Sequence, residues 1–80
     1  MNDELRRQIH ETDATIRVGK RGIDPVVDEL ADQLQDRRLV KVKFLRSALG
    51  ATSTEALAEE LASAAGADLV ETRGHTAVFQ

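Results

Sequence analysis

Residues 18–25 have the sequence VGKRGIDP and place two basic side chains between two glycines, where an expected strand leads into an expected helix. Gly19 and Gly22 lack a Cβ atom, so they can adopt positive φ and let another backbone approach closely. Lys20 and Arg21 supply positive charge at the tip of the same loop. This combination predicts a clamp for an anion, such as the phosphate groups of a polymer backbone.

The residues after this loop are typical of a helix start. Asp24 suits the N-cap and Pro25 suits the first helical position. The unpaired amide N–H groups of the first helical turn would then lie beside the loop, where they attract anions. The alternative interpretation is an ordinary strand-to-helix turn that carries two solvated charges.

The distribution of charge favours the anion site. The chain has a net charge of −3, yet residues 15–23 and 37–54 contain eight of its eleven Lys and Arg residues and none of its fourteen Asp and Glu residues. If these two basic windows are adjacent in the fold, an acidic chain acquires one positive face that attracts a polyanion. The candidate binding residues are Gly19, Lys20, Arg21, Gly22, Arg17, Arg37, Arg38, Lys41, Lys43 and Arg46.

Composition limits the class of protein. Eighty residues predict one domain spanning residues 1–80. The absence of cysteine agrees with a reducing compartment, and no apolar run approaches the length of a membrane span, so we expect a soluble cytoplasmic protein that does not engage a membrane. The preference for Arg over Lys, together with many Asp, Glu and Ala residues, suggests a salt-adapted source.

Candidates for catalysis are few. His10 and His75 are the only histidines, and their spacing matches no metal-binding motif. The chain also lacks a phosphate-binding P-loop and a nucleophile elbow. The sequence therefore predicts no catalytic residue, no metal, no cofactor and no small-molecule substrate.

The chain offers almost no aromatic surface. Phe44 and Phe79 are its only aromatic residues, and Phe44 alternates with Val40 and Val42 as a core residue would. Because base stacking requires exposed aromatic side chains, nucleic acid would have to be bound mainly through phosphate, sugar and shape.

Hydrophobic periodicity predicts three helices and four strands. Residues 39–45 alternate, so Lys41 and Lys43 should face away from the core and share an exposed sheet surface with Arg17. The expected order is a helix over 3–12, a strand over 15–18, a helix over 24–36, a strand over 39–45, a helix that ends at Gly66, and strands over 69–72 and 75–79.

Three local features refine this order. Residues 46–51 are expected to form a loop, and Thr52 with Glu55 to form a capping box for the third helix. A hairpin turn is expected at Arg73-Gly74. The resulting α-β-α-β-α-β-β order predicts an α/β two-layer sandwich with a mixed four-stranded sheet, whose charged side is uncovered or partly covered by the N-terminal helix.

Three motifs in order, VGKRG at 18–22, LVKVKF at 39–44 and AGADLVETRGHTAVF at 65–79, resemble the CRM domain (chloroplast RNA splicing and ribosome maturation) family in its stand-alone, YhbY-like prokaryotic form. The resemblance covers nearly the whole chain. It implies a fold similar to the C-terminal domain of bacterial translation initiation factor three. It also implies that residues 19–22 contact RNA, in a role similar to the GxxG loop of KH domains.

The same resemblance implies a partner. Prokaryotic members of the family are associated with precursors of the large ribosomal subunit, so ribosomal RNA or a pre-ribosomal particle is expected. The chain departs from the family pattern at His75, Phe79 and Gln80, where members often carry Lys, Tyr and Arg. The resemblance therefore assigns no RNA contact to the last strand.

Two other functions are compatible with a basic face. The chain could be a protein-interaction module on a ribosome or translation complex, with its basic face on an acidic partner. It could also be a small DNA-binding chromatin protein. Competition between duplex DNA and RNA would distinguish the two functions, because an RNA-specific surface can contact 2′-hydroxyl groups, which DNA lacks.

Overall fold

The computed structural model describes residues 3–80 and contains four strands and four α-helices, with one short 3-10 helix. In chain order the elements are α1 (Asp3–Glu11), β1 (Ala14–Val18), η1 (Asp24–Val26), α2 (Val27–Asp36), β2 (Val40–Phe44), α3 (Arg46–Leu49), α4 (Thr54–Ala65), β3 (Leu69–Arg73) and β4 (Thr76–Phe79).

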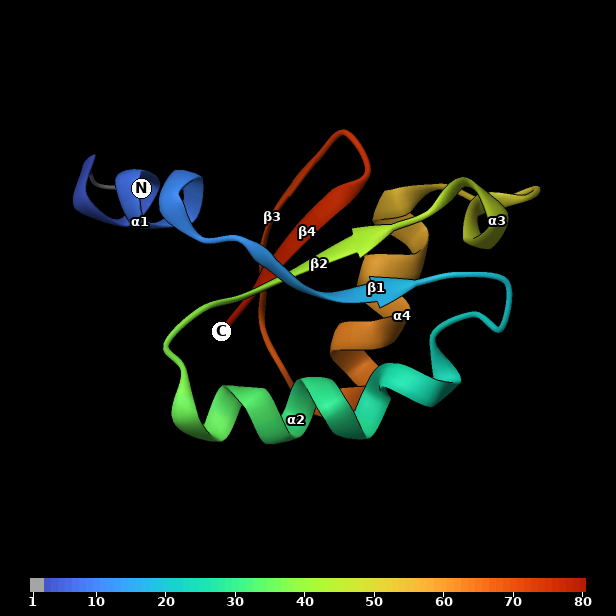
Figure 1. Cartoon of the computed structure of the whole chain (residues 1–80), viewed down its shortest axis with the longest axis horizontal. Coiled ribbons are helices and arrows are strands. Elements are labelled where there is room, and N and C mark those ends of the chain that lie inside the picture. The colour runs from blue at the N-terminus through green and yellow to red at the C-terminus, as the bar shows by residue number, and fades with distance from the viewer. Residues whose placement is uncertain (1–2) are drawn as a thin grey trace.

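The strands form one mixed sheet in the order β1-β2-β4-β3 (Figure 1). β1 and β2 are parallel, which requires the crossover that α2 supplies. β4 pairs antiparallel with both β2 and β3, so the chain ends in a hairpin. The predicted α/β class and the mixed four-stranded sheet are confirmed. The likeness to the initiation factor domain stays a prediction.

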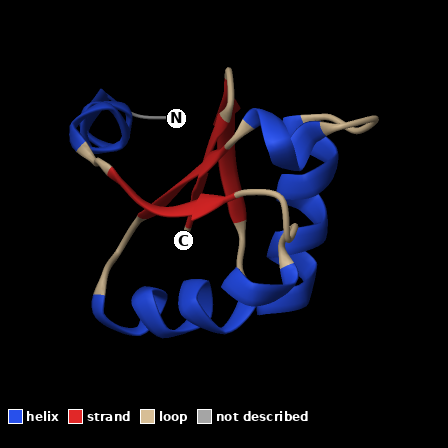
Figure 2. Ribbon diagram, turned by 45° about the vertical axis from the view of Figure 1, so that its right-hand side comes forward, coloured by secondary structure: helices blue, strands red, loops and turns tan. Residues whose placement is uncertain are grey.

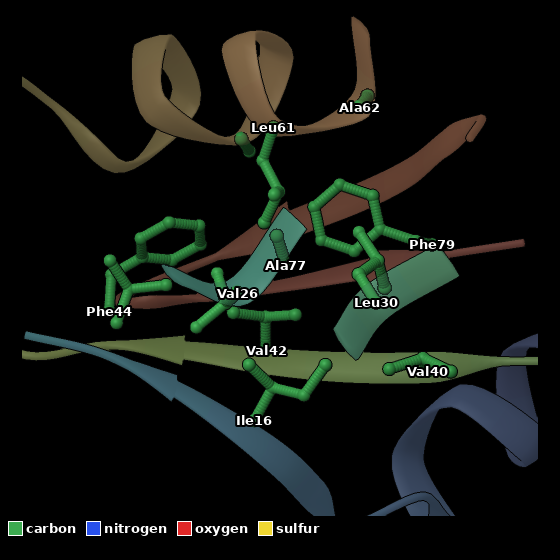
Figure 3. Packing of buried hydrophobic residues seen from close by; sticks show 12 residues of the cluster. Ile16, Val26, Leu30, Val40, Val42, Phe44, Leu61, Ala62, Ala77 and Phe79 are labelled. Atoms are coloured by element: carbon green, nitrogen blue, oxygen red, sulfur yellow. The ribbon is translucent and has the colours of Figure 1, made fainter. Parts of the chain in front are cut away.

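Two helices cover one face of this sheet, which we call the inner face. Figure 1 shows α2 and α4 on this side. Alternation in β2 buries Val40, Val42 and Phe44 against these helices, each at most 1% exposed. Leu30 of α2 and Leu61 of α4 complete the centre of the core, as Figure 3 shows.

The opposite face, the outer face, carries the charged strand residues and is only partly covered. α1 lies on this side, away from the other helices (Figure 2). Its Ile9 is 3% exposed and packs in a second, smaller cluster with Leu39 and Val78. This partial cover by the N-terminal helix agrees with the prediction.

The start of the second helix differs from the prediction. Ile23 already has helical dihedral angles, φ −82° and ψ −23°, so Asp24 lies inside a 3-10 turn and is not an N-cap. The α-helix proper begins at Val27, and the preceding residue makes no side-chain capping bond. Val26 is 7% exposed, and its burial in the core holds the 3-10 turn in position without a polar N-cap.

Three further boundaries were predicted wrongly. Residues 46–51 are not all loop, because they include α3. Ser53, not Thr52, caps α4, and its hydroxyl oxygen accepts a 3.1 Å hydrogen bond from the Ala56 amide. Thr52 belongs to the preceding turn after α3, where its amide donates a hydrogen bond to the Leu49 carbonyl. The hairpin turn lies at Gly74-His75, one residue later than expected, and Gly74 takes the positive φ of 57°.

None of the helices within residues 3–80 has the length and apolar character that crossing a membrane requires.

Candidate nucleic-acid interface

The parallel pairing of β1 with β2 brings the two basic windows of the sequence together. Both strands end at the same end of the sheet, where the Leu45 amide donates a 2.8 Å hydrogen bond to the Val18 carbonyl. The segment that follows β1 is the turn of residues 19–22, which we call the GKRG turn. The segment that follows β2 is α3, beginning at Arg46. We call this the GKRG end of the sheet.

The GKRG turn is a hydrogen-bonded β-turn. The Gly22 amide donates to the Gly19 carbonyl at 2.9 Å, which places Lys20 and Arg21 at the two central positions. Both side chains are exposed. No residue other than glycine has positive φ within residues 3–80, so the turn is of type I. Two cations therefore project from a short, closed loop.

The two glycines of the turn do different things. Gly22 has φ +76° and follows the central residues, and a Cβ built there would meet no atom within 4 Å. Gly19 does not have positive φ, so that prediction was wrong for this residue. A Cβ on Gly19 would make ordinary contacts of 3.6 Å with Leu45 Cδ1 and 3.7 Å with Ser47 Oγ. Only Gly22 is required by the backbone conformation.

A pocket of about 350 Å³ opens beside this turn. Its lining combines cationic side chains with apolar ones, and the apolar part consists of Pro25, Val26 and Leu45. The predicted binding residues did not include these three, since only the fold shows that β2 ends beside the helix that follows the turn. The cationic side chains and turn residues of the lining are Arg17, Gly19, Lys20, Arg21 and Gly22.

The outer face continues this positive surface. Arg17 of β1 and Lys43 of β2 are register partners, and both are exposed. Directly opposed side chains project from the same face of a sheet, so the two cations are neighbours. Lys41 lies on the same face but is half-buried, two residues farther from the GKRG end and next to Val78. The predicted sharing of one sheet face is confirmed.

Arg37 and Arg38 are placed differently. They precede β2, whereas the GKRG turn lies beyond its carboxyl end, and a five-residue strand is roughly 16 Å long. Arg38 instead lines a hollow with residues at the end of α1, including Glu11 and Thr12. The two arginines therefore lie at the opposite end of β2 from the GKRG turn, and their part in the binding site stays a prediction.

Within residues 3–80 the cations of the site form no ion pair. Across residues 3–80 one ion pair is formed, between Arg7 and Glu4 of α1. Like charges side by side, as at Arg17 and Lys43, are destabilising without a counter-ion. The same part of the chain holds no cluster of three or more His, Asp or Glu side chains that could bind a metal ion. The arrangement fits an external polyanion.

Fold and site together define a small α/β protein with a cationic turn next to a cationic sheet face. The chain belongs to the CRS1 / YhbY (CRM) domain family, whose pattern matches residues 2–79.

Two known proteins are similar to this chain. It is 37% identical over 75 residues to a probable RNA-binding protein of Methanocaldococcus jannaschii, an alignment that covers 94% of this chain but 56% of that relative. The chain thus spans about half the length of this relative. The solution structure of a hypothetical Staphylococcus aureus protein, named as a candidate RNA-binding protein, matches with a TM-score of 0.73 and 31% identity. That match covers 95% of this chain and 78% of the other.

Proposed function

We propose that this protein binds structured RNA by the phosphate backbone, through the GKRG turn, Arg46 and the adjacent outer face. The observation that carries the proposal is the parallel β1–β2 pair. It sets Arg17 beside Lys43 and joins the ends of both strands, so that separate stretches of sequence form one cationic surface. Contacts to phosphate oxygens fix the position of a nucleic acid but carry little base information.

We favour RNA as the partner over DNA and over an acidic protein. The two relatives described above have names that refer to RNA binding, and neither name refers to DNA binding or to protein interaction. The pocket beside the GKRG turn adds apolar surface from Pro25, Val26 and Leu45 to three cations. Such a pocket fits a sugar or base next to a bound phosphate.

The biological setting that we propose is assembly or maturation of the large ribosomal subunit in the cytoplasm, with ribosomal RNA or a pre-ribosomal particle as partner. Crosslinking in cells followed by sequencing of the bound RNA tests this setting. Enrichment of precursor ribosomal RNA is the expected result. Enrichment of unrelated transcripts would contradict the setting but leave RNA binding intact.

The chain offers a matched pair of variants for the binding site. Lys20→Ala with Arg21→Ala and Arg37→Ala with Arg38→Ala each remove two adjacent exposed cations, at opposite ends of β2. We expect the first variant to lower the slope of log affinity against log salt by roughly 1.4–1.8, the share of two neutralised phosphates. The second should change the slope much less. Both should unfold like the parent, because exposed charges contribute little to stability.

Binding of a labelled RNA hairpin, measured by fluorescence anisotropy from about 50 to 200 mM salt, checks this prediction. Equal losses in the two variants would show that total charge matters and the turn does not. Duplex DNA and an acidic peptide serve as competitors in the same assay. Displacement of the RNA by either one at equal phosphate or carboxylate concentration would favour the corresponding alternative function.

A further inference from the structure

The outer face carries a further cation, Arg73, that lies outside the two basic windows of the sequence. Arg73 ends β3, on the far side of the sheet from β1. Its register partner is Thr76 of β4, which in turn is the partner of Lys43. Because Lys43 also pairs with Arg17, one transverse row crosses all four strands. The row contains three cations, one hydroxyl and no carboxylate.

A second observation places Arg73 on the outer face. Its Nη1 atom lies 3.5 Å from both ring nitrogens of His10, in the last turn of α1. Since α1 packs on the outer face through Ile9 and Val78, the guanidinium group must lie on that face too. The backbone beneath it is fixed, because the Thr76 hydroxyl donates a 2.8 Å hydrogen bond to the Arg73 carbonyl.

The same end of the sheet holds the hairpin turn. The Phe44 amide donates a 2.7 Å hydrogen bond to the His75 carbonyl, so the β3–β4 turn lies next to the end of β2. The GKRG turn, the start of α3 and the hairpin turn are thus all at the GKRG end. Arg17 and Arg73 are separated by three strand spacings, roughly 14 Å.

We propose that the bound RNA backbone extends from the GKRG turn across the outer face to Arg73, which contacts a phosphate of its own. This inference rests on the proposed function and adds to it a second contact point on the β3–β4 hairpin. The proposal is based on the row of like charges formed by Arg17, Lys43 and Arg73. Arg73 is exposed and forms no ion pair within residues 3–80, so its guanidinium group is available to a phosphate. A phosphodiester backbone lying across the strands supplies the counter-charges that the row lacks.

Salt-dependent binding of a labelled RNA hairpin to the full chain tests the inference. Arg73→Ala should lower the slope of log affinity against log salt by roughly 0.7–0.9, the share of one phosphate. Arg73→Lys should retain the parent slope, because the charge remains. His10→Ala removes the contact with Arg73 without removing a row cation and should also retain the slope. Circular dichroism and thermal unfolding establish that each variant folds.

The outcomes separate the inference from the proposed function. If Arg73→Ala keeps the parent slope while Lys20→Ala with Arg21→Ala lowers it, the second contact is refuted and RNA binding at the turn stands. If Arg73→Ala and His10→Ala lose affinity equally with unchanged slopes, Arg73 only positions α1, and the inference is again overturned. If neither the turn variant nor Arg73→Ala alters the slope, the proposed function itself fails.

Discussion

Gly22 is the residue whose backbone sets the shape of the GKRG turn. Gly22 has φ +76°, and most other residues would be strained in this left-handed region by about 1–2 kcal/mol. A Cβ there points into open space, so protein packing adds nothing to this penalty. If RNA binds at the turn as proposed, a phosphate would approach through this open space, so the same substitution tests both conformation and access.

We therefore expect Gly22→Ala to lower the free energy of unfolding by about 1 kcal/mol and to weaken RNA binding. Its salt slope should stay near that of the parent, because no cation is lost. Gly22→Asn distinguishes the two causes, since Asn tolerates the left-handed region but still carries a Cβ. Recovery of stability without recovery of affinity would identify close approach of the ligand as the reason for glycine.

Gly19→Ala is the matched control at the other glycine of the turn. It does not need positive φ, and its new Cβ would make ordinary contacts with Leu45 and Ser47. We expect no loss of stability in chemical denaturation and RNA affinity close to the parent. A large loss of affinity with Gly19→Ala would show that the turn changes conformation when RNA binds.

At the scale of single elements, the start of α4 offers a clean test of local capping. Ser53 has an extended backbone, φ −119° and ψ 163°, and its side chain satisfies the Ala56 amide. We expect Ser53→Ala to lower the free energy of unfolding by about 0.5–2 kcal/mol, the usual effect of losing an N-cap. Thr52→Ala should have little effect, since Thr52 is exposed and no hydrogen bond of its side chain caps the helix. Denaturant titration of the two variants compares them directly, and equal losses would contradict this assignment of the cap.

The elements that periodicity specifies were predictable, whereas several of their ends were not. β2 alternates perfectly between core and cation, and the parallel pairing then follows from the intervening α2. The cap of α4 was misplaced by one residue because Thr52 and Ser53 are both good caps, and the choice depends on the turn that closes after α3. α3 itself, with four residues, is too short for a periodic signal.

The candidate site was predictable in part for the same reason. The GKRG turn is local in sequence, and Lys43 is placed by strand alternation. Arg37 and Arg38 belong to the same basic window as Lys43, but the window runs the length of β2, so its two ends are far apart. Arg73 has acidic Glu71 two residues before it and lies in no basic window, so only strand register joins it to the row.

At the scale of the whole molecule, the helices that cover the inner face are acidic, whereas the row of cations lies on the outer face. α2 and α4 carry Asp and Glu but no Lys or Arg. The outer face also holds Glu71, which pairs with Val78 in the row next to that of Arg73, and the acidic residues of α1 lie on the same side. The net charge of −3 therefore opposes association with RNA at long range, even though the local surface attracts it. Which of the two effects dominates depends on the distance over which salt screens charge.

Glu59 and Glu60 of α4 are exposed and lie on the far side of the sheet core from the proposed RNA surface, so their removal isolates the long-range effect. Glu59→Gln with Glu60→Gln should strengthen RNA binding at about 0.01 M salt, where the Debye length is about 30 Å, longer than the molecule's shortest extent of 18 Å. At about 0.15 M salt the Debye length is about 8 Å, and the variant should bind like the parent. Anisotropy titrations at the two salt concentrations make the comparison. An equal gain of affinity at both would mean that α4 lies against the RNA, and the bound surface would then have to include the helical side of the protein.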